Sequence, residues 1–269
     1  MGKAKNKKAE FLKNHPLCCY CGGSEPATTI DHMPPSIFFD GKQRPHGFEF
    51  PACKRCNNGT GAEERVAAFI ARLYPEPDTE KGRKEVERLM GAVHRTNPGL
   101  LKEMMPSRRD QRNFMKNRLG LKPGRDGSAS KISIMKLNGP QVLHCLHTFG
   151  RKLTCAAHYY GTGQIIPPGG AIWLHFSSNV DHFEGNPLPD NLLKMMGDPL
   201  TLKQGSFSVG DQFAIRMTNS SDPRLSAYLA KFRFAFSLTG IVHCEPPDGF
   251  GPDTAEIFHP FNWTDSQGS

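Results

Sequence analysis

Long apolar runs are missing from this sequence of 269 residues. No stretch approaches the roughly 18 to 20 consecutive apolar residues that cross a bilayer. The basic start leads into Phe11, Leu12 and Lys13 without the apolar core of a secretory signal. Internal repeats and low-complexity tracts are absent, and the glycines at 161–163 are not followed by the Gly-Lys-Ser/Thr of a phosphate loop. We therefore expect a cytoplasmic protein that is neither membrane-spanning, secreted nor fibrous.

Basic charge is scarce in the second half of the chain. Residues 1–150 contain 26 Lys and Arg against 15 Asp and Glu, whereas residues 151–269 contain 8 against 11. The segment 101–136 is especially basic, with ten Lys and Arg against three Asp and Glu. A polyanion would be attracted to the N-terminal half and not to the C-terminal half. A solvated basic face explains the charge equally well, so charge alone does not decide the function.

Hydrophobic periodicity predicts helices first and strands later. The composition of residues 121–130, rich in Gly and Ser, is typical of a linker between two domains, 1–120 and 131–269. The predicted class is α+β, with a small metal-organised module and helices followed by a sheet-containing domain of unknown role. Residues 2–14 are predicted to be a basic arm that runs into a short helix. Further predicted helices cover residues 62–74, 81–95, parts of 99–119, and 140–160, and the predicted strands cover 171–178, 212–218 and 228–243.

Two Cys-x-x-Cys pairs, Cys18 with Cys21 and Cys53 with Cys56, are the most informative residues. The turn inside each pair lets both thiolates face one ion, and four sulfurs suit tetrahedral Zn(II) at about 2.3 Å. Free buried cysteines and a redox pair are the alternatives, but neither explains a second matched pair nearby. We predict a structural zinc site without an open position for substrate, with Cys19 outside it.

The segment between the pairs contains a short strand that ends in Asp31-His32, and Asn57 directly follows the last cysteine. The ordered combination of Cys-x-x-Cys, Asp-His-x-x-Pro and Cys-x-x-Cys-Asn resembles the zinc-knuckle form of the HNH endonuclease family. The resemblance covers about residues 15–75. It implies a β-hairpin followed by a helix, folded around a catalytic divalent metal, with the four-cysteine zinc holding the ends together.

The resemblance makes His32 the general base and makes Asp31 and Asn57 ligands of a catalytic Mg(II) or Mn(II). A neutral imidazole can accept a proton from water at physiological pH, and carboxylate and amide oxygens suit these cations. Neighbouring strand residues point to opposite faces, so a bulge or the strand end has to bring the Asp and the His together. The middle asparagine of the motif does not carry over: Phe48 stands there, and His46 replaces it only if the loop is displaced.

Other polar residues are weighed against simpler explanations. Arg109, Arg112 and Lys116 recur at three- and four-residue spacing, which favours one cationic stripe that contacts nucleic-acid phosphates, although a solvated helix explains them equally well. His144 and Cys155 would lie about 16 Å apart along one helix and cannot share an ion. We therefore predict that the His and Cys residues of 144–158 serve packing and the surface.

Two functions follow from these residues. The first is a metal-dependent HNH endonuclease that hydrolyses DNA phosphodiester bonds, with RNA left open as a substrate. The alternative is a non-catalytic, zinc-containing nucleic-acid-binding protein that keeps the fold without the reaction. Asp31-His32 and Asn57 favour the enzyme, and Phe48 at the middle position favours the binding protein.

Overall fold

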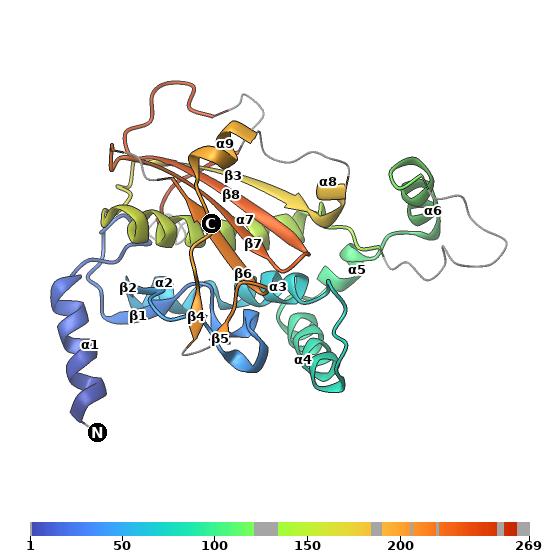
Figure 1. Cartoon of the computed structure of the whole chain (residues 1–269), viewed down its shortest axis with the longest axis horizontal. Helices are drawn as coiled ribbons and strands as arrows, with labels where there is room; N and C mark the ends of the chain where they lie inside the picture. Colours follow the sequence, from blue (N-terminus) through green and yellow to red (C-terminus); the bar gives the residue numbers. More distant parts are fainter. Residues whose placement is uncertain are drawn as a thin grey trace.

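The computed structural model describes residues 2–120, 134–183, 190–204, 207–218, 221–251 and 256–262. The long helix α7 (Pro140–Thr162) lies between two layers, a five-stranded sheet on one side and the N-terminal strands with helix α3 (Gly61–Ala71) on the other (Figure 1). The predicted linker at 121–130 lies outside the described residues. The structure is mixed α and β, as the sequence predicted.

A small hairpin and helix form the N-terminal layer. Strands β1 (Thr29–His32) and β2 (Glu49–Ala52) pair antiparallel, and helix α2 (Lys54–Asn58) follows at once. The chain between the strands makes two short 3-10 turns, η1 (Ser36–Phe38) and η2 (Asp40–Lys42). Before the hairpin, α1 (Gly2–Asn14) extends at one end of the molecule (Figure 1), as expected for the basic arm.

The predicted helices of the middle segment are present. Helix α3 buries most of its length because it packs on both α7 and α4 (Glu80–Thr96). Helix α4 is amphipathic and buries Leu89 and Val93, and the Thr79 hydroxyl caps it by accepting from the Gly82 N–H. Two further helices follow, α5 (Leu100–Met104) and α6 (Arg108–Asn117).

The second half contains the main sheet, whose neighbouring strands are all antiparallel. Gly150 of α7 brings the helix close to this sheet, because a Cβ there would lie 3.1 Å from a Leu174 methyl and 3.3 Å from a Leu238 methyl. In spatial order the strands are β6 (Phe213–Met217), β7 (Leu225–Phe232), β8 (Phe236–His243), β3 (Ala171–Ser178) and β9 (Ile257–Phe258). The remaining elements are α8 (Asn179–Phe183), α9 (Asp190–Met195), β4 (Lys203–Gln204) and β5 (Phe207–Ser208).

One predicted strand is wrong in its extent. Residues 228–243 form the end of β7, a turn and all of β8, not a single strand. The reversal occurs at Arg233, which adopts a left-handed φ of 51°, with exposed Phe234 beside it. Non-glycine residues adopt this conformation uncommonly, and no Gly, Pro or Asn marks the turn in the sequence.

The hydrophobic core is continuous across the two halves of the chain. Phe149 of α7 is fully buried and stacks on Phe38 of η1 at 5.0 Å between ring centroids. The same ring contacts Phe232 of β7 at 5.5 Å, so one side chain joins the N-terminal layer to the sheet. The predicted domains 1–120 and 131–269 therefore share a core. Within the described ranges, no helix has the length and apolar character needed to span a membrane.

Candidate zinc centre and the Asp31–His32 strand

Four buried cysteines converge before β1 and at the start of α2. The sulfur atoms of Cys18, Cys21, Cys53 and Cys56 all lie within 4.8 Å of one another. Four sulfurs bound at 2.3 Å to a tetrahedral ion would be about 3.8 Å apart, so a slight contraction of this cluster could hold Zn(II). Among the described residues, no other group of three or more His, Cys, Asp or Glu side chains is close enough to hold a metal ion.

The local chain geometry accounts for the convergence. Gly22 and Gly23 have φ values of 65° and 75°, which only glycine adopts without strain, and they reverse the chain after Cys21. At the other pair, the Cys53 sulfur accepts a hydrogen bond from the Cys56 N–H at 3.4 Å, so a metal-ligand candidate also caps helix α2. A zinc ion would thus tie the chain before β1 to the helix after β2.

The cysteines of α7 belong to a different environment. Burial raises the pKa of both Cys145 and Cys155 to about 12, so these thiols stay protonated at neutral pH. His144 is exposed, whereas His158 is buried. These positions agree with the packing and surface roles predicted for this helix.

Asp31 faces the interior and meets a buried lysine of α7. Its Oδ2 lies 2.9 Å from Nζ of Lys152, whose side chain has no exposed surface. The same Nζ lies 2.7 Å from Oε1 of Glu64 and donates to the Thr60 hydroxyl at 3.0 Å. The Thr60 hydroxyl in turn donates to Glu64 at 2.7 Å. We refer to these four residues, Asp31, Thr60, Glu64 and Lys152, as the Lys152 cluster.

The cluster keeps its lysine charged. Burial by itself would lower the pKa of Lys152, but the carboxylates of Asp31 and Glu64 outweigh it and raise that pKa above its ordinary value. Burial raises the pKa of Glu64, and the lysine opposes this effect. A single ammonium therefore lies between two carboxyl groups in a site that α7 covers.

The residues predicted to bind Mg(II) or Mn(II) do not fit such an ion in this arrangement. A cation at Asp31 would adjoin the ammonium of Lys152, and like charges repel strongly at low dielectric. The Asn57 side chain is engaged through Nδ2, which donates to the Thr29 hydroxyl at 3.0 Å. Helix α7 also buries Asp31, which leaves the carboxyl group little access to solvent or substrate.

His32 lies on the other face of β1. The pairing of β1 and β2 is unbroken, with Asp31 opposite Phe50 and His32 opposite Glu49, so no bulge turns the neighbouring side chains to one side. His32 Nε2 lies 2.7 Å from Nη2 of Arg44. A guanidinium only donates, so Nε2 is the acceptor and the ring proton is on Nδ1, 3.9 Å from Glu49 Oε1.

The half-buried position of His32 favours its neutral form. Burial, followed by the positive charge of Arg44, lowers the pKa of His32 below its ordinary value of 6.5, against the opposing effect of Glu49. A neutral imidazole is the form that a general base requires. The lone pair on Nε2, however, already accepts a hydrogen bond from Arg44.

Phe48 at the middle motif position is a packing residue. Its buried ring stacks on Tyr160 of α7 with centroids 4.8 Å apart. His46 does not replace the missing asparagine: its side chain is exposed, and its backbone N–H donates to the Lys203 carbonyl. Arg44 is the residue that contacts the histidine instead.

Arg44, Lys152 and Thr60 were not singled out from the sequence. Lys152 did have a signal, since it follows Cys145 by seven positions and Phe149 by three, within the apolar stripe of α7. A charged residue in such a stripe requires a buried partner of opposite charge. Arg44 had no comparable signal, because it belongs to an irregular loop.

The predicted cationic stripe is on the surface but not beside His32. Arg109, Arg112 and Lys116 are all exposed on α6. Helix α6 lies at the end of the molecule opposite to α1, away from β1 and β2 (Figure 1). Any nucleic acid bound by this stripe would therefore contact a region separate from the hairpin.

Comparisons with protein-family models, with curated proteins and with solved structures give no significant match. The resemblance to HNH endonucleases thus rests on the cysteine pairs, Asp31-His32 and Asn57 themselves, and it stays a prediction.

Proposed function

We propose that this chain is a zinc-containing nucleic-acid-binding protein that uses the β1–β2–α2 unit as a scaffold and not as a divalent-metal active site. Of the two functions that the sequence predicts, this is the alternative without catalysis. The observation that carries the choice is the ion pair between Asp31 and Lys152.

The Lys152 cluster supports this choice in two ways. Its ammonium supplies the positive charge that a divalent ion would otherwise supply between Asp31 and Glu64. In addition, α7 packs over the carboxyl groups, so a phosphodiester could reach them only if the helix moved away. Displacing α7 would expose a core that also supports the sheet.

The charge distribution supports an anionic partner. The first 150 residues carry the excess of Lys and Arg, and the arginines and lysine of the α6 stripe extend into solvent. Because each phosphate contact releases bound counterions, binding of this kind weakens steeply as salt is added. We take duplex DNA as the first ligand to test.

Cleavage remains a second candidate, and one observation favours it. His32 is neutral, half-buried and accompanied by Arg44, a group that can neutralise a phosphate. This pair lies on the opposite strand face from Lys152, so it is not covered in the same way.

One experiment decides between the two candidates. Purified protein is incubated with supercoiled plasmid and either Mg(II) or Mn(II), and binding to a labelled duplex is measured in parallel at several salt concentrations. We expect salt-sensitive binding and intact plasmid. Cleavage that disappears in His32→Ala would contradict the proposal and restore the nuclease, whereas cleavage that persists in His32→Ala would identify a contaminant. Absence of any binding would also contradict it.

A further inference from the structure

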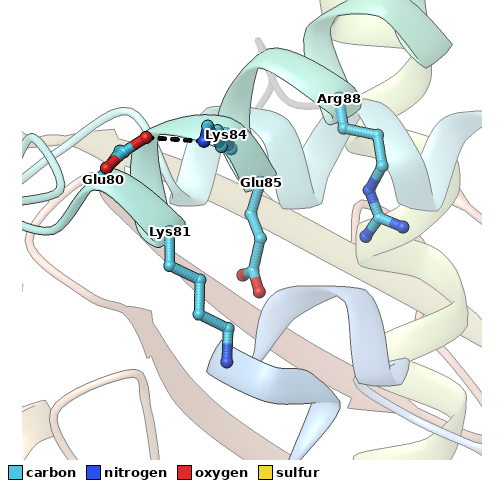
Figure 2. Close-up of a pocket in the computed structure, with 5 residues that line it drawn as sticks. All are labelled: Glu80, Lys81, Lys84, Glu85 and Arg88. Atoms are coloured by element: carbon cyan, nitrogen blue, oxygen red, sulfur yellow. Dashed lines mark ion pairs between the residues drawn. The ribbon is translucent and has the colours of Figure 1, made fainter.

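Two hollows adjoin along helix α4: the first is lined by α4 alone, and the second lies between α4, the turns η1 and η2, and the end of α3. The first has a volume of about 410 Å³ and the second about 370 Å³, and they share Glu85 and Arg88. Together they form what we call the basic groove. Figure 2 shows Lys81, Glu85 and Arg88 extending from α4 into the first hollow. The groove is lined by Ile37, Gly41, Lys42, Arg72, Glu80, Lys81, Lys84, Glu85, Arg88 and Leu89.

The two acidic residues of the groove are already paired. Glu80 lies 2.6 Å from Lys84 (Figure 2). Glu85 contacts Arg72, which is itself buried and also bound to Asp40. Lys42, Lys81 and Arg88 have no ion-pair partner within the described part of the chain. The groove therefore offers three uncompensated cations in one concave surface.

The backbone at Lys42 has an uncommon conformation. It has a left-handed φ of 61°, which is uncommon for a lysine and costs conformational energy. The turn that imposes this conformation is anchored at Asp40, whose Oδ1 lies 2.8 Å from Nη2 of both Arg72 and Arg233. The exposed Lys42 side chain therefore starts from a fixed point on the wall of the groove.

The groove is also linked to the half-buried histidine. Arg44, the partner of His32, follows Lys42 by two residues, and two residues span at most about 7 Å. The anchored turn thus places one cation in the groove and the next beside His32. A polyanion bound along the groove would therefore extend toward His32.

We propose that the basic groove is the site that holds the phosphate backbone of the bound nucleic acid. This inference rests on the proposed function and adds its binding site. Backbone contacts of this kind give affinity without reading sequence, because phosphates are the same at every position. The stripe on α6 is then a secondary contact.

A matched pair of variants tests the groove. Lys81→Gln/Arg88→Gln removes two free cations, and Lys194→Gln/Lys231→Gln removes the same charge from exposed positions outside the groove. The full-length proteins are titrated with a fluorescent duplex of mixed sequence at salt concentrations from 0.05 to 0.5 M. Two lost phosphate contacts should reduce the salt slope by about 1.8 and weaken binding about 60-fold at 0.1 M salt.

Lys42→Asn adds an independent readout. Asparagine tolerates the left-handed backbone at this position, so the turn should persist while the charge is lost. We expect a further reduction of the salt slope by about one. Circular dichroism of each variant establishes that the helices are retained.

The outcomes distinguish a failure of the groove inference from a failure of the proposed function. A loss confined to the groove variants supports the inference. Equal weakening of the groove and control variants, or no weakening of either, overturns the groove but leaves nucleic-acid binding intact. If the wild-type protein binds no duplex at any salt concentration, the proposed function itself fails and the groove with it.

Discussion

Lys152 illustrates how one side chain can change the role of a motif. Asp31 and its neighbour His32 are the residues that the sequence offers for catalysis, yet the carboxylate is committed to an ammonium from a distant helix. An ammonium can take the place of a divalent ion here, because both neutralise a pair of buried carboxyl groups. What the ammonium does not offer is an open coordination position for a phosphate oxygen.

Removing the lysine should therefore be costly. In Lys152→Met, two carboxyl groups would remain buried without their cation, so we expect the free energy of unfolding to fall by about 3 to 5 kcal/mol. Urea denaturation measures this change. The control is Asp31→Asn/Glu64→Gln/Lys152→Met, in which no buried charge remains and most of the stability should return. A loss below about 1 kcal/mol in the single variant would show that the ion pair does not form.

His158 gives the structure a measurable dependence on pH. Burial lowers its pKa from 6.5 to about 4, while its Nδ1 lies 2.8 Å from the Ser226 hydroxyl. Below pH 6.5 the unfolded chain takes up a proton that the folded chain refuses until about pH 4, so stability is full above pH 6.5 and falls as the pH drops. The difference corresponds to about 3 kcal/mol over this window.

The measurement compares wild type with His158→Gln, because acid would also protonate any zinc-bound thiolates in both proteins. We expect the wild type to lose about 3 kcal/mol more than the variant between pH 6.5 and pH 4. Parallel pH profiles for the two proteins would mean that His158 is protonated in the folded state.

At the scale of elements, the β1–β2–α2 unit is too small to be held by its own apolar contacts. Its two strands have four residues each and its helix has five, so it depends on packing against the rest of the core, and an ion that joins both ends would stabilise it further. Cys53→Ser should reduce bound zinc well below one equivalent per chain and lower the melting temperature.

Cys19→Ala is the matched control, because Cys19 is buried beside Cys18 but lies outside the four-sulfur group. It should keep one equivalent of zinc. Metal content by atomic emission and thermal unfolding by circular dichroism report the two effects. Equal zinc content in both variants would contradict the four-thiolate site.

The elements show where sequence reasoning succeeds. Helices α3, α4 and α7 and strand β3 repeat apolar residues with a clear period, and each lies within two or three residues of its predicted bounds. The cysteine cluster could be predicted because each Cys-x-x-Cys pair is a local pattern and two matched pairs supply four sulfurs. The β7–β8 turn could not, since Arg233 adopts its conformation under tertiary constraint, and the contacts of Arg44 and Lys152 depend on how distant segments pack.

At the scale of the whole molecule, helix α7 connects the N-terminal layer to the C-terminal sheet. It packs against α3 on one side and against β3, β7 and β8 on the other. The same helix therefore covers Asp31 and supports the sheet. We therefore expect the N-terminal layer to open only when the C-terminal sheet also loosens.

Both halves should consequently unfold together, and Phe149 provides the test. Phe149→Ala removes the ring between Phe38 and Phe232 and should cost about 3 to 5 kcal/mol. Hydrogen exchange in α3 and in β8, followed at increasing urea, should show both losing protection at the same lowered denaturant concentration.

Phe234→Ala is the control. Its ring is 71% exposed, so the substitution should change the free energy of unfolding by less than about 0.5 kcal/mol. Separate transitions for α3 and β8, with only one shifted by Phe149→Ala, would mean that the N-terminal layer can open alone, and that Asp31 can then be exposed to a metal and a substrate.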